Sequence, residues 1–241
     1  MMAVNNKIAP VNANDKMVEY ECNGEIVKLT PNIIKNFLVN GGGNVTDQEV
    51  TMFLNLCRFQ HLNPFLREAY LVKYGSQPAT IVTGKDAFTK RARRNKDYRG
   101  NQAGVIVIKN DGTLENRIGS LVLKDEEIAG GWAKVYIEGD IVPTEVSVSF
   151  DEYVGTKSDG TVNSQWSKKP ATMIRKVALV QALREAFPED FGGMYSQEEV
   201  GVYDLPESPV ITASDEQTLP PAQEMPDDDF FAGMEPPPEM M

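Results

Sequence analysis

Hydrophobic residues recur at helical spacing in four stretches of the chain. These stretches are residues 31–40, 47–59, 83–95 and 170–187. Thr30 and Pro31 fit an N-cap followed by a proline at the first helical position. Thr46 and Glu49 fit a capping box, and Thr83 marks the start of the third stretch. The pattern therefore predicts four helices.

Short alternating or β-branched runs between these helices predict strands. They span residues 25–29, 68–74, 79–83, 104–109, 117–123, 131–138 and 142–150. The triplets 110–112 and 138–140, Asn-Asp-Gly and Glu-Gly-Asp, are typical of hairpin turns. We expect the middle of the chain to form an antiparallel meander, so that the fold class is α+β.

The two ends of the chain differ from its centre. Residues 1–29 have weak periodicity and predict a flexible arm that holds one strand. Residues 204–241 are rich in proline, methionine and acid, and they predict a disordered tail. Residues 30–203 remain as one core domain.

Charge is distributed unevenly along the chain. The net charge is -11, from 24 basic and 35 acidic residues, and this total at first argues against a nucleic-acid partner. Residues 201–241 carry 10 of the acids and none of the bases, which leaves 24 bases and 25 acids in residues 1–200. Most of the net negative charge therefore lies in the tail. The remainder of the chain has nearly equal numbers of bases and acids, which is compatible with a cationic surface on the core.

The first basic segment is the predicted helix 83–95 and the residues after it. Its candidate DNA contacts are Lys85, Lys90, Arg91, Arg93, Arg94, Lys96, Tyr98 and Arg99. Like charges three or four residues apart destabilise a helix by about 0.2–0.5 kcal/mol per pair, and an anionic partner would remove this cost. Tyr98 adds a ring that could stack on a base. The alternative is a solvated basic face that acids elsewhere neutralise.

The second basic segment lies at the start of the last helix. Its candidates are Trp166, Lys168, Lys169, Arg175 and Lys176, around Pro170 as the first helical residue. Lysines beside a helix N-terminus are unfavourable by about 0.3–1 kcal/mol each, whereas a phosphate bound there would reverse the sign. For Trp166 two roles stay open, stacking on a base and packing in the core.

Other kinds of site have little support in the sequence. Gly41 to Gly43 lack the Gly-Lys-Ser/Thr ending of a phosphate loop, so no motif predicts ATP binding. His61 is the only histidine and there is no Cys-x-x-Cys, which argues against structural zinc and a catalytic triad. No apolar stretch is long enough to span a membrane, and two cysteines do not make a disulfide framework, so we expect a cytoplasmic protein.

Several strings resemble the RecT/Bet family of phage recombinases. They are Leu62-Asn63-Pro64-Phe65 followed by Glu68, Tyr70 and Val72, then Thr83 to Phe88, and later Gln165-Trp166, Pro170, Met173 to Lys176, Ala178, Ala182 to Arg184 and Ala186 to Pro188. No string is decisive alone, but their order and spacing are specific over roughly residues 30–199.

The resemblance implies an α+β fold with a small antiparallel sheet packed on a long helix. It also implies ATP-independent annealing of single-stranded DNA, without catalytic residues or a bound metal, although Mg²⁺ could affect the DNA complexes. The expected partners are other copies of the chain in rings or filaments, a phage exonuclease and the host single-stranded-DNA-binding protein. The acidic tail departs from the helical module of some relatives, and it could compete with DNA or only aid solubility.

Three other functions remain possible from the sequence, and one of them is a structural phage or prophage protein whose basic patches bind acidic partners. A single-stranded-DNA-coating protein would use the same basic segments but would not anneal strands. A metal-dependent nuclease would need scattered carboxylates to converge in space.

Overall fold

The computed structural model describes residues 16–157 and 159–201. All of them belong to the first of two compact units, Met1–Leu205 and Pro206–Met241. The predicted tail, residues 204–241, and the start of the predicted arm lie outside the described residues. The elements are β1 (Val18–Cys22), β2 (Glu25–Leu29), α1 (Pro31–Phe37), β3 (Val39–Asn40), α2 (Asp47–Phe59), the 3-10 helix η1 (Pro64–Leu66), β4 (Ala69–Val72), β5 (Thr80–Thr83), α3 (Lys85–Ala92), β6 (Tyr98–Ile108), β7 (Leu114–Ile118), β8 (Glu127–Ile137), β9 (Thr144–Ser149), α4 (Phe150–Tyr153), α5 (Ser164–Lys168), α6 (Pro170–Ala186) and α7 (Pro188–Phe191).

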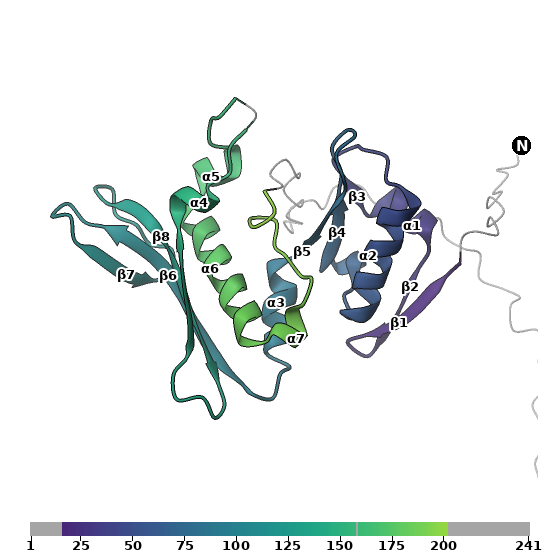
Figure 1. Cartoon of the computed structure of the whole chain (residues 1–241), viewed down its shortest axis with the longest axis horizontal. Coiled ribbons are helices and arrows are strands. Elements are labelled where there is room, and N and C mark those ends of the chain that lie inside the picture. Colours follow the sequence, from purple (N-terminus) through teal and green to yellow (C-terminus); the bar gives the residue numbers. More distant parts are fainter. Residues whose placement is uncertain (1–15, 158, 202–241) are drawn as a thin grey trace, which may run out of the picture. The chain divides into compact units, whose positions relative to one another are not determined.

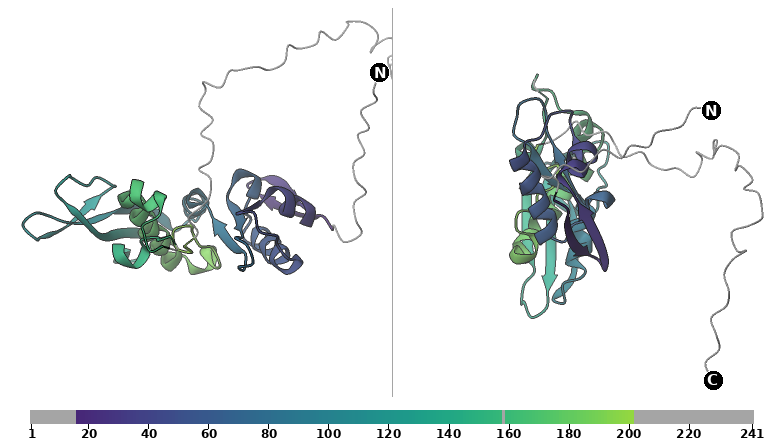
Figure 2. Two further views of the ribbon diagram at one scale, coloured as in Figure 1. Left: turned by 90° about the horizontal axis from the view of Figure 1, so that it is seen from above. Right: turned by 90° about the vertical axis from the view of Figure 1, so that its right-hand side faces the viewer.

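A four-stranded antiparallel sheet packs against the long helix α6 (Figures 1 and 2). Valines and alanines on one face of β6, β8 and β9 are buried with the apolar side of α6. Gly131 allows close approach, because a Cβ there would lie 2.6 Å from the carbonyl oxygen of Ile174 in α6. The predicted α+β class, with a small antiparallel sheet on a long helix, is confirmed.

The strand order corrects the predicted meander. The order is β7-β6-β8-β9, so β8 pairs with β6 and not with the strand that precedes it. The two long strands β6 and β8 carry most of the buried apolar residues and pair in the centre, whereas the short, mostly polar β7 takes an edge. Strand β7 also ends at Ile118, so the strand predicted over residues 117–123 was misplaced.

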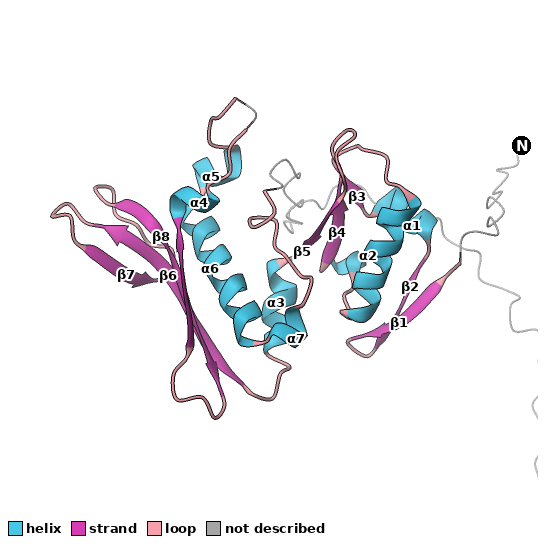
Figure 3. Ribbon diagram, in the orientation of Figure 1, coloured by secondary structure: helices cyan, strands magenta, loops and turns pink. Residues whose placement is uncertain are grey.

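The N-terminal elements pack around α2 (Figure 3). Strand β3 pairs in parallel with β4, which pairs antiparallel with β5. The capping box of α2 is present, with the Thr46 hydroxyl accepting from the Glu49 N–H at 3.2 Å. The strand predicted over residues 25–29 is present as β2 (Glu25–Leu29). It pairs with β1 in a hairpin whose Cys22 and Leu29 side chains are buried, so the chain is part of the folded unit from Val18 onward and is not a flexible arm there.

One helix start was predicted wrongly, and three short helices were not predicted. Helix α3 begins at Lys85 with Gly84 as its N-cap, and Thr83 is a buried residue of β5 that caps nothing. The short helices α4, α5 and α7 were not predicted, since four or five residues are too few to show a helical period.

Candidate nucleic-acid interface

Helix α3 starts directly against the turn that follows η1. The Gly84 N–H donates to the Glu68 carbonyl oxygen at 3.0 Å. A Cβ on Gly84 would lie 2.8 Å from the Arg67 carbonyl oxygen, so only glycine fits without moving the backbone. No side chain caps the helix at Gly84. The positive end of the α3 dipole therefore has no side-chain acceptor at this cap.

A pocket of about 390 Å³ opens at this end of α3. It is lined by Leu66, Arg67, Glu68, Gly84, Lys85, Asp86, Ala87, Lys90 and Lys176. We call it the cationic pocket, because four basic side chains from three separate parts of the chain meet in it. Helix N-termini with lysine and arginine around them bind phosphate groups well.

Buried carboxylates hold two of these lysines in place. Lys90 Nζ lies 3.1 Å from Glu68 Oε1, and Lys176 Nζ lies 3.1 Å from Glu198 Oε1. An ammonium group has three donors, so each lysine keeps N–H groups that can reach a phosphate. Counting Glu198, the pocket holds four cations against three carboxylates, and its net charge is +1. This small positive net charge attracts an anion, but only weakly.

A second pocket, of about 840 Å³, opens at the other end of α3. It is lined by Glu21, Asn23, Gly24, His61, Arg91, Arg94, Asn95, Lys96, Asp97 and Asp190. The Arg91 guanidinium donates to the Gln60 carbonyl oxygen, and burial lowers its pKa. Arg91 thus fastens α3 to the end of α2, while Arg94 and Lys96 are exposed to solvent.

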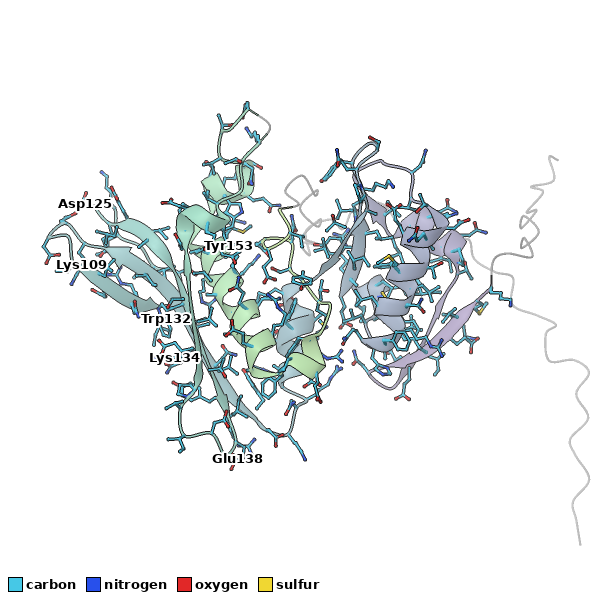
Figure 4. All side chains as sticks on the ribbon, viewed as in Figure 1. Lys109, Asp125, Trp132, Lys134, Glu138 and Tyr153 are labelled. Carbon is cyan, nitrogen blue, oxygen red and sulfur yellow. The ribbon has the colours of Figure 1, made fainter. Side chains whose placement is uncertain are left out.

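The remaining predicted cations line neither of these pockets. Arg99 pairs with Glu138, which Figure 4 places at the turn after β8. Arg175 Nε donates to the Ala103 carbonyl oxygen at 3.1 Å and so ties α6 to the sheet. Arg93, Lys168 and Lys169 are exposed. The structure brings the two basic segments together through Lys85, Lys90 and Lys176, and not through the lysine pair that precedes Pro170.

Both predicted aromatic side chains pack against other aromatic rings of the protein. Trp166 is 0% exposed, and its ring lies edge-on to Phe150 with centroids 5.7 Å apart. This burial rules out base stacking by Trp166 and supports the core role that the sequence left open. Tyr98 is half-buried against Phe187, with centroids 6.3 Å apart, so its ring is also engaged.

Sequence reasoning missed Arg67, Glu68 and Glu198. Arg67 ends η1 in the left-handed conformation, with φ of 56°, and its position beside α3 depends on the fold. Glu68 was part of a string that resembles the family but was given no role in binding, and Glu198 was one of many acids in the sequence. The available signals were this string and the Asn63-Pro64 pair, which is typical of a turn.

Within residues 16–157 and 159–201, no helix is long and apolar enough to cross a membrane. Over the same ranges, no three His, Cys, Asp or Glu side chains gather as metal ligands.

The chain is similar to known proteins at two levels, that of a family and that of a single relative. Residues 24–213 match the RecT family. A protein from Ureaplasma parvum serovar 3, named "Uncharacterized protein UU154", is 26% identical over 180 residues, which cover 73% of this chain and 72% of that protein.

Proposed function

The chain belongs to the RecT family of DNA-recombination proteins, and we propose that it binds single-stranded DNA along α3 and anneals complementary strands without ATP. The observation that carries the proposal is the meeting of Lys85, Lys90 and Lys176 at the open N-terminus of α3. These groups suit a sugar-phosphate backbone, and none of them reads a base. We therefore expect affinity to depend steeply on salt and weakly on sequence.

The mechanism that we propose is electrostatic. Two strands repel each other through their phosphates, so neutralising one backbone lowers the barrier to pairing. Base pairing supplies the driving force, and no step needs a nucleotide, a resident metal or a covalent intermediate. Mg²⁺ would act only on the DNA complexes.

Self-assembly completes the proposed function. One cationic pocket covers few nucleotides, so a pairing segment would need several subunits in a row. Head-to-tail contacts generate such rows as rings or filaments. An exonuclease and a host single-stranded-DNA-binding protein stay predictions as partners, and so does the bacterial cytoplasm as location.

The test is annealing of labelled complementary oligonucleotides by the purified full chain in buffer with EDTA and without ATP. The wild-type chain should accelerate duplex formation. A chain that slowed it would be a coating protein, and cleavage products after addition of Mg²⁺ or Mn²⁺ would indicate a nuclease.

The site is tested by the double variant Lys90→Gln/Lys176→Gln. Losing two phosphate contacts should flatten the slope of log affinity against log salt by about 1.4 for a single strand. Lys28→Gln is the control, since Lys28 pairs with Glu19 on the β1-β2 hairpin and lines neither pocket. An equal slope for the double variant and the control would place the DNA elsewhere.

A further inference from the structure

Two large apolar side chains project into solvent beside the cationic pocket. Phe65 is 52% exposed and Leu66 is 60% exposed, and both belong to η1. Leu66 lines the cationic pocket together with Arg67 and Lys90. Two adjacent exposed apolar side chains beside a cationic site would suit a ligand that has both charge and apolar surface.

Their exposure does not come from a loose loop. The Asn63 side chain accepts from the Phe65 N–H at 3.0 Å, and Pro64 is buried. The Arg67 N–H donates to the Pro64 carbonyl oxygen at 3.1 Å, which closes the turn. Glu68 Oε2 accepts from the Asn63 N–H at 2.9 Å and so fixes the start of the turn. The fold thus holds the two side chains in a set position.

The same carboxylate connects this turn to the pocket. One oxygen of Glu68 binds the Asn63 N–H and the other lies 3.1 Å from Lys90 Nζ. Because one buried group anchors both, the apolar pair keeps a fixed position relative to a phosphate-binding lysine. In single-stranded DNA, every nucleotide carries a phosphate and a base. A phosphate site with an apolar surface beside it therefore matches the chemistry of this polymer.

We propose that Phe65 and Leu66 form an apolar platform for the bases of the strand whose phosphates occupy the cationic pocket. This inference rests on the proposed function. Stacking on an aromatic ring is tolerant of sequence, because every base has a flat π face. The platform takes the role that the sequence suggested for Trp166, which is buried, and for Tyr98, whose half-buried ring packs against Phe187.

The test compares Phe65→Ala and wild-type chains on two oligonucleotides of equal length, one normal and one in which most sites are abasic. Phe65→Ala should bind the normal strand about tenfold more weakly, and the abasic strand as well as wild type does. Phe65→Trp should restore binding to the normal strand. Leu66→Ala should show a smaller loss with the same dependence on bases.

The control is Phe37→Ala, which removes another exposed phenylalanine, 78% exposed, at the end of α1 and outside both pockets. Circular dichroism should show that all variants melt as wild type does. Equal losses on both oligonucleotides, no loss on either, or a change in assembled mass without a change in affinity would overturn the platform. Failure of the wild-type chain to bind either strand would instead overturn the proposed function.

Discussion

Lys73 is a buried lysine that depends on one carboxylate. Its Nζ lies 2.7 Å from Glu49 Oε2, and its side chain is 8% exposed. Glu49 also accepts the N–H groups of Thr46 and Ala79, at 2.8 and 2.7 Å. The ion pair with Lys73 and these hydrogen bonds lower the pKa of Glu49 to about 2. Glu49 therefore links the start of α2 to the β4-β5 connection.

We predict that Glu49→Gln lowers the free energy of unfolding at pH 7 by about 3 kcal/mol, because it leaves the Lys73 ammonium buried without a counter-charge. A carboxyl with a lowered folded-state pKa stabilises the fold above its unfolded pKa, and this stability is lost as pH falls toward the folded value. The difference between wild type and variant should thus shrink from about pH 4.5 to pH 2. Urea unfolding across that range measures it, and a constant difference would contradict the role of the Glu49 charge.

Helix α3 is fixed at both ends and in its centre. The Gly84 N–H donates a hydrogen bond to the Glu68 carbonyl oxygen in the turn after η1. The Arg91 guanidinium donates to the Gln60 carbonyl oxygen at the end of α2. Between them, the Phe88 ring stacks on Phe191 of α7 with centroids 5.6 Å apart. The helix thus cannot shift alone, and its lysines keep their place in the cationic pocket.

We predict that Gly84→Ala destabilises the chain by about 1–3 kcal/mol, since the added Cβ overlaps the Arg67 carbonyl oxygen. DNA affinity should fall as well, because the helix start and the Arg67 turn must separate. Gly192→Ala is the matched control: its Cβ would lie 3.5 Å from the Pro188 oxygen, an ordinary contact. Thermal melting and oligonucleotide titration measure both effects, and equal behaviour of the two variants would show that the close approach at Gly84 is unimportant.

At the scale of the described unit, the sheet has an open edge at β7. Arg117 and Glu115 lie opposite Val105 and Val107, on the side that faces α6. Leu114 and Ile118 therefore lie on the other face, and both are exposed. An edge strand with exposed apolar residues is a common site of chain-to-chain contact, which makes β7 our candidate for the subunit contact.

We predict that Leu114→Thr/Ile118→Thr lowers the mass of DNA-bound assemblies, because it removes apolar contact area but keeps β propensity. Light scattering measures the mass, and affinity for an oligonucleotide that fits one subunit should stay unchanged. Ile26→Thr, at an exposed position of β2, is the control. Assemblies of wild-type mass in the double variant would exclude this edge as the subunit contact.

Elements with local signals could be predicted from the amino-acid sequence. The capping box of α2, Pro31 and Pro170 at their helix starts, and the apolar stripe of α6 depend on residues within a few positions of one another. Local hydrogen bonds and periodicity decide such features, so they can be read without the fold. The family strings and the two basic segments were visible for the same reason.

Which of these residues lie close together could be seen only from the folded chain. Strand order, the burial of Trp166 and the joining of Lys90 with Lys176 depend on contacts between residues far apart in the chain. Such contacts follow from how the apolar faces of whole elements pack, and no short stretch of sequence encodes that packing. For this reason the basic segments were identified from the sequence, whereas the pocket that three of their lysines share was found only in the fold.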